Sequence, residues 1–173
     1  MKRFILILSG SILLSACNNA MKKLADSVYI QQRSTVTKAY PQVDSLLIVA
    51  NGNSATQRIM EDVIPFFKEG LKKRGINAVS VFVSYKDKKI NEAEFNNRNY
   101  AYTLWIYEQD RTLQKLDGYD FLVPLAMKLT ENKSSDNVWI ATSIFNDYVR
   151  KKYYNEKYAG TLVLLLRANG FIR

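Results

Sequence analysis

The chain has 173 residues, with 25 Lys and Arg against 16 Asp and Glu, one Cys and no His. Without His there is no Ser-His-Asp or Cys-His nucleophile pair, no His-bearing zinc site and no imidazole proton shuttle. A single Cys excludes an intrachain disulfide and a thiolate metal cluster. The length and an apolar content of 47% suit one domain with a full hydrophobic core.

Residues 1–16 have the pattern of a signal peptide. Lys2 and Arg3 precede an apolar run at residues 4–14. A membrane-spanning helix needs about 20 apolar residues, so this run is too short to cross a bilayer. Cleavage after residue 16 would remove Lys2 and Arg3 and lower the side-chain charge from +9 to +7.

The only Cys follows this apolar run directly. The segment Leu14-Ser15-Ala16-Cys17 resembles the lipobox of bacterial lipoproteins. The resemblance implies cleavage before Cys17, acylation of its thiol, and anchoring by two or three acyl chains, which hold more firmly than one. In that family Asn rather than Asp after the Cys, here Asn18, favours the periplasmic side of the outer membrane. The alternative is an ordinary secretory signal with an incidental Cys.

The rest of the chain divides into a polar stretch and a periodic one. Residues 17–43 are predicted to form a lipidated N-terminus and a tether, with a short helix within 22–35. Strong hydrophobic periodicity begins at Ser45, so residues 44–173 are predicted to form a single α/β domain.

A strand, a helix and a second strand begin this domain. Residues 45–51 are an uninterrupted apolar run, which is typical of a buried strand. Ser54 and Gln57 fit a capping box, so a helix should begin there and be kinked by Pro65. Residues 78–85 alternate and are rich in Val, which predicts the second strand. The succession predicts a βαβ unit with parallel strands.

Three further apolar segments, 99–108, 119–130 and 137–146, are predicted strands. The short polar link between the last two predicts an antiparallel hairpin. Pro124 lacks a backbone donor, so its strand should lie at an edge of the sheet or carry a bulge. Leu and Tyr at helical spacing predict a closing helix over 148–169.

The predicted fold is α+β with the order β-α-β-β-β-α, a mixed five-stranded sheet with two main helices packed on one face. The order of elements, the segment VWIATSIFND and the closing LRANGFI resemble small α/β domains of bacterial envelope lipoproteins and the N-terminal domain of the Tol-Pal propeller protein. The resemblance implies a domain without enzymatic activity.

The loop Asn51-Gly52-Asn53-Ser54 is the first candidate site. It lies between a strand and a helix start, where backbone N–H groups and the helix dipole favour an anion. It resembles the phosphate loop of flavodoxins and the first loop of Gly-Asp-Ser esterases. The esterases need a His and the flavodoxins need five alternating βα units, so no cofactor is expected. The alternative is a turn in which Ser caps the helix.

Aromatic residues of the third strand, Tyr100, Tyr102, Trp105 and Tyr107, are the second candidate, an interaction surface. Alternation places Tyr100 and Tyr102 on one face and Trp105 and Tyr107 on the other. One face must be core, and the other could be a platform for a partner protein or a glycan. The alternative is ordinary cross-strand aromatic packing.

Four carboxylates, Glu108, Asp110, Asp117 and Asp120, surround the predicted turn after the third strand. A pair of them could serve acid-base hydrolysis, and a cluster could hold Ca²⁺. They lack EF-hand spacing and fit solvated turn positions better, so no metal site is predicted.

Basic residues are concentrated at 72–74, 86–89 and 150–152. They solvate helix ends and loops or, beside a lipid anchor, face anionic head groups. No nucleic-acid-binding module accompanies them, so nucleic acid is not an expected partner.

Together these features predict a lipid-anchored lipoprotein of the bacterial cell envelope. Its partners are the membrane, through Cys17, and another envelope protein, which a non-catalytic domain would bind or scaffold. A small-ligand-binding or glycan-binding lipoprotein is the alternative, and a hydrolase that works without His ranks below both. The sequence leaves the oligomeric state open, since an exposed strand edge permits dimerisation.

Overall fold

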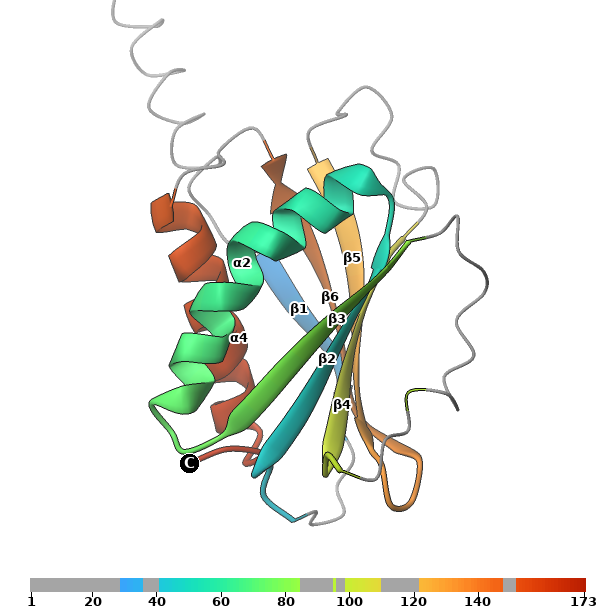
Figure 1. Cartoon of the computed structure of the whole chain (residues 1–173), viewed down its shortest axis with the longest axis vertical. Helices are drawn as coiled ribbons and strands as arrows, with labels where there is room; N and C mark the ends of the chain where they lie inside the picture. Colours follow the sequence, from blue (N-terminus) through green and yellow to red (C-terminus); the bar gives the residue numbers. More distant parts are fainter. Residues whose placement is uncertain (1–28, 36–40, 85–94, 96–98, 110–121, 148–151) are drawn as a thin grey trace, which may run out of the picture.

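The computed structural model describes residues 29–35, 41–84, 95, 99–109, 122–147 and 152–173. These residues form one sheet with two helices on one of its faces (Figure 1). The elements in chain order are β1 (Tyr29–Thr35), β2 (Ser45–Gly52), α2 (Ser54–Lys72), β3 (Asn77–Ser84), β4 (Tyr102–Glu108), β5 (Leu122–Glu131), β6 (Asp136–Asn146) and α4 (Lys152–Ala168).

The sheet is mixed and has six strands in the order β1-β6-β5-β4-β2-β3. β2 pairs in parallel with both β3 and β4, so the predicted βαβ unit is confirmed. β5 and β6 form the predicted antiparallel hairpin, whose turn includes Ser135 at a φ of 62°. The α+β class and the two helices on one face are likewise confirmed.

The predicted count of five strands is wrong, because β1 adds a sixth. β1 pairs antiparallel with β6, from Tyr29 opposite Ile144 to Thr35 opposite Trp139. The described part of the predicted helix over 22–35 is therefore a strand, and the sheet begins inside the segment assigned to the tether, 17–43. Of the β1 side chains that the structure describes, Ile30 packs against the core, and the sequence YIQQRST lacks the alternating apolar signal that identifies a strand.

β5 lies between β4 and β6, so the expectation that Pro124 marks an edge is wrong. The Pro124 carbonyl accepts a hydrogen bond of 2.9 Å from the backbone N–H of Gln109, which follows β4. The N and C=O of a strand residue point to the same neighbouring strand. The N of Pro124 therefore also points to the chain after Glu108, where β4 has ended, and its missing N–H costs the sheet no hydrogen bond within β4. The register shift in this pairing lies at Leu129 and Thr130 instead.

Helix α2 is capped one residue earlier than expected. The N-cap is Asn53, whose Oδ1 accepts from the backbone N–H groups of Ala55 at 2.8 Å and Thr56 at 3.0 Å. The predicted capping box of Ser54 with Gln57 is therefore wrong. Both Asn and Ser are strong N-caps, so the sequence allows either position and the end of β2 selects between them.

Pro65 lies inside α2, which continues through it as one helix of 19 residues. Pro65 is exposed, whereas Val63 and Phe67 on either side of it are buried. The carbonyl that loses its helical partner belongs to Glu61, which is also exposed and can bond to water. Packing of the buried side chains compensates for the proline.

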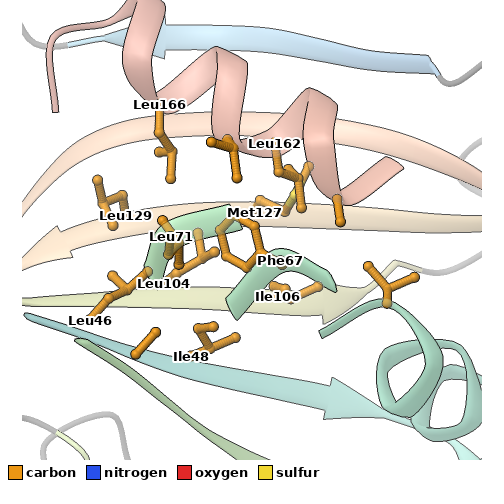
Figure 2. Close-up of a cluster of buried hydrophobic side chains, with 14 of the residues drawn as sticks. Leu46, Ile48, Phe67, Leu71, Leu104, Ile106, Met127, Leu129, Leu162 and Leu166 are labelled. Atoms are coloured by element: carbon orange, nitrogen blue, oxygen red, sulfur yellow. The ribbon is translucent and has the colours of Figure 1, made fainter. Parts of the chain in front are cut away.

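The main core fills the space between the sheet and the two helices (Figure 2). Alternate residues of β2, β4 and β5 point into it and meet the inner faces of α2 and α4. The labelled side chains in Figure 2 are Leu46, Ile48, Phe67, Leu71, Leu104, Ile106, Met127, Leu129, Leu162 and Leu166. A smaller cluster of Leu47, Val49 and Trp105 lies on the opposite face of the sheet.

Candidate functional site

The turn between β2 and α2 holds the first candidate site, and the end of β4 lies beside it. β2 and β4 are parallel neighbours, so Glu108 at the end of β4 reaches the turn. Its Oε2 accepts from the Asn53 backbone N–H at 3.1 Å, and its Oε1 accepts from Asn53 Nδ2 at 2.8 Å. The hydroxyl of Thr56 also donates to Oε2. A carboxylate of the protein itself thus occupies the N-terminus of α2.

This arrangement decides what the turn can bind. The N–H groups of Ala55 and Thr56 are taken by Asn53 Oδ1, and that of Asn53 is taken by Glu108. Glu108 also supplies the negative charge that the helix dipole favours at this end. An external anion would have to displace these bonds and would be repelled by the carboxylate. The geometry favours a structural turn over an anion site.

The remaining predicted residues of this loop also serve the fold. The side chain of Asn51 is 6% exposed and donates from Nδ2 to the Val83 carbonyl at 3.1 Å, which links β2 to β3. A Cβ built on Gly52 would lie 2.6 Å from Thr56 Cβ and 3.0 Å from Glu108 Oε2. Gly52 therefore allows the close approach of the helix start and the carboxylate.

Glu108 is the residue of this turn that the sequence did not connect with the loop. The position of Glu108 could have indicated this contact. Glu108 is the last residue of an apolar run parallel to β2, and parallel strands end at the same edge of a sheet. Asp110, Asp117 and Asp120 lie outside the described residues. Among the residues that are described, no group of three or more His, Cys, Asp or Glu side chains is placed to hold a metal ion.

The aromatic residues of the second candidate do not form one surface. Tyr102 is 1% exposed, belongs to the core beneath the helices and donates its hydroxyl to the Pro41 carbonyl. Trp105 is fully buried on the opposite face. Tyr100 packs with Trp105 rather than with the Tyr102 side, contrary to the predicted alternation, because β4 begins only at Tyr102.

Trp105 is the centre of the smaller cluster. Its ring is nearly parallel to that of Tyr107, with an interplanar angle of 5° and centroids 6.1 Å apart. Phe95 approaches edge-on at 6.1 Å, and Lys128 Nζ lies 5.6 Å from the Trp105 centroid. This packing closes over the indole, so the ring serves as a second core and not as an exposed platform.

A groove of about 490 Å³ separates the outer sides of the two helices. The helices approach closely at Gly70, where a Cβ would be 3.0 Å from Val163 Cγ2. Glu69 and Lys73 form an ion pair of 2.8 Å on the rim, and the hydrogen bond and charge of Lys73 lower the pKa of Glu69. The lining residues are Phe66, Glu69, Gly70, Lys73, Arg74, Glu156, Gly160, Val163 and Leu164.

Cys17 and the preceding residues lie outside the part of the chain that the structure describes. Within the described part, neither helix has the length and apolar character required to cross a membrane.

Neither a family model nor a curated protein matches the chain. Among solved structures, a PelC dodecamer from Paraburkholderia phytofirmans is similar with a TM-score of 0.50 and 15% identity, covering 85% of this chain and 99% of that one. A PelC variant dodecamer from the same organism has a TM-score of 0.49 and 16% identity, covering 85% and 100%. The LpoB C-terminal domain from Escherichia coli has 0.33 and 12%, covering 64% and 89%. At these identities the likeness concerns the fold alone.

Proposed function

We propose that this protein is a lipoprotein of the bacterial cell envelope, anchored through Cys17 on the periplasmic side of the outer membrane. We further propose that its domain works by assembly with envelope proteins and not by catalysis. The observation that carries the assembly role is the difference between the two candidate sites and strand β3. Both candidate sites are filled by the protein's own groups, Glu108 in the turn and Phe95 on Trp105, whereas apolar side chains are exposed on β3.

The likeness to a PelC dodecamer supports the assembly role, since a similar fold occurs there in a multi-subunit assembly. The glycan-binding alternative has less support, because the indole of Trp105 is buried and offers no free ring face.

The anchor would keep one end of the domain within reach of the membrane. The chain from Cys17 to Tyr29 spans at most about 40 Å when fully extended. Tyr29 pairs with Ile144 near the end of β6, at the end of the sheet that also holds the start of α2. The anchor would therefore draw this end toward the membrane and leave the β5–β6 turn at the far end.

Substitution of Cys17 tests the anchor. In Cys17→Ser we expect loss of labelling by radioactive palmitate and transfer from the detergent phase to the aqueous phase in detergent partitioning, because the acylated thiol is absent. Asn18→Asp is the matched control: it should stay acylated but move toward the inner membrane. Persistent acylation of Cys17→Ser would contradict the anchor.

Co-purification tests the assembly role separately. The acylated chain, used as bait in detergent-solubilised envelope, should retain a partner in fixed ratio, either another envelope protein or further copies of itself. A bait that stays monomeric and captures nothing would overturn the assembly role and leave the anchor standing.

A further inference from the structure

The two edges of the sheet differ in how well they are protected against pairing with another chain. Edge strand β1 carries the exposed, charged Arg33 and a register shift between Gln32 and Ser34, both of which hinder the addition of a strand. Edge strand β3 has neither device. Its sequence NAVSVFVS contains no charge and no proline, and its register with β2 is regular throughout.

The outer side of β3 presents a regular row of backbone groups. The N–H of Asn77 bonds to the Asp44 carbonyl at 3.1 Å, so Asn77 directs its backbone inward to β2. In a parallel ladder this alternates, so Val79 and Val81 also bond inward, and the N–H and C=O groups of Ala78, Ser80 and Phe82 point outward. Among the described residues, no strand pairs with this row.

The side chains of β3 are compatible with the addition of another strand at this edge. Val79 and Val81 are each 38% exposed on the face opposite the helices. Antiparallel pairing must place outward-pointing backbone groups opposite each other, here Ser80 against Ser80 and Ala78 against Phe82. This register also puts Val79 of one copy opposite Val81 of the other, on one face.

We propose that β3 is the edge at which a second copy of this chain adds by antiparallel pairing about a two-fold axis, a proposal that rests on the assembly role and names its partner. The central Val79-Ser80-Val81 is the same when read in either direction, so valine meets valine and serine meets serine, while Ala78 meets Phe82. The side-chain charge of the cleaved chain is +7, so two copies repel each other overall, but the strand itself carries no charge and pairing along it brings no like charges directly opposite each other.

The test compares two substitutions in one row of the sheet. The pairs Val81–Val49, Val49–Trp105, Trp105–Lys128 and Lys128–Ile140 place Val81 and Ile140 on the same face at opposite sides. Their exposures, 38% and 36%, are matched. In the full chain purified in detergent, we expect Val81→Glu to weaken self-association by about tenfold or more, because each new carboxylate would be placed opposite the apolar Val79 of the other copy and the two carboxylates would lie diagonally across the two-fold. Ile140→Glu should leave it unchanged.

Charge reversal makes the test specific. Val79→Lys alone should also weaken self-association, and an equimolar mixture of Val81→Glu and Val79→Lys should restore it as a mixed pair, because the new carboxylate and ammonium groups would lie opposite each other; light scattering and cross-linking measure both. If Val81→Glu reduces the melting temperature more than Ile140→Glu does, Val79→Glu replaces it, since this side chain lies opposite Val81 in the proposed register.

A wild-type chain that stays monomeric, or variants at both β3 positions that associate as Ile140→Glu does, would overturn the proposal. A monomeric chain that still captures another envelope protein would overturn it and leave the assembly role intact.

Discussion

Two glycines show how little a residue type says without its surroundings. A Cβ on Gly52 would collide with Thr56 at 2.6 Å, whereas a Cβ on Gly160, in helix α4, would meet nothing within 4 Å. Gly52 is required by close packing of the helix start on the strand end. Gly160 only weakens its helix, because Gly has a low helix propensity.

Alanine at these two positions should have opposite effects. We expect Gly52→Ala to lower the free energy of unfolding by about 1–3 kcal/mol, since Thr56 and Glu108 must move away from the new methyl group. Gly160→Ala should raise it by up to about 1 kcal/mol. Urea unfolding of both variants measures the difference, and equal effects would show that the Gly52 contact carries no strain.

At the level of elements, β1 is the clearest case of a structure that local pattern does not reveal. Its residues YIQQRST are mostly polar, and its pairing depends on the free edge that β6 presents. By contrast, β2 was predictable from its uninterrupted apolar run, α2 from apolar residues at helical spacing, and the β5–β6 hairpin from two apolar segments with a short polar link.

Truncation should separate a strand from a tether. A chain that begins at Pro41 lacks β1, which leaves the edge of β6 unpaired and removes Ile30 from the core. We expect it to unfold at a lower urea concentration than a chain that begins at Val28. Loss of the apolar side chain alone should lower the free energy of unfolding by about 1–3 kcal/mol. Identical unfolding of the two chains would mean that β1 contributes no stability.

At the level of the whole molecule, buried hydroxyl groups join the helix layer to the sheet. The hydroxyls of Tyr158 on α4 and Ser143 on β6 are hydrogen bonded, and Tyr154 accepts at its hydroxyl from the Asn146 N–H at 3.2 Å. Burial raises the pKa of both tyrosines, because desolvation penalises the phenolate.

The raised pKa values make the free energy of unfolding fall at alkaline pH. The raised pKa of Tyr158 means that its contribution is fully present below the unfolded pKa of about 10 and is lost as the pH rises through the folded value. Tyr158→Phe should cost about 1 kcal/mol at pH 8 through the lost hydrogen bond, and should lose less stability than wild type between about pH 10 and 12. Tyr153→Phe, at a tyrosine that is 66% exposed, is the control and should follow wild type. Parallel alkaline profiles for Tyr158→Phe and wild type would contradict the linkage.

The sequence by itself determined the features that depend on near neighbours in the chain: the missing His chemistry, the βαβ unit, the hairpin, the two helices and the lipobox pattern that predicts the anchor. The tertiary structure alone decided which distant groups meet. Glu108 bonds to the N-cap residue Asn53 from 55 residues away, Phe95 packs on Trp105, β1 adds a sixth strand, and β3 forms an edge of the sheet made by the described residues. The reason is physical: hydrophobic period reports which face of an element is buried, but strand order decides what lies beside it.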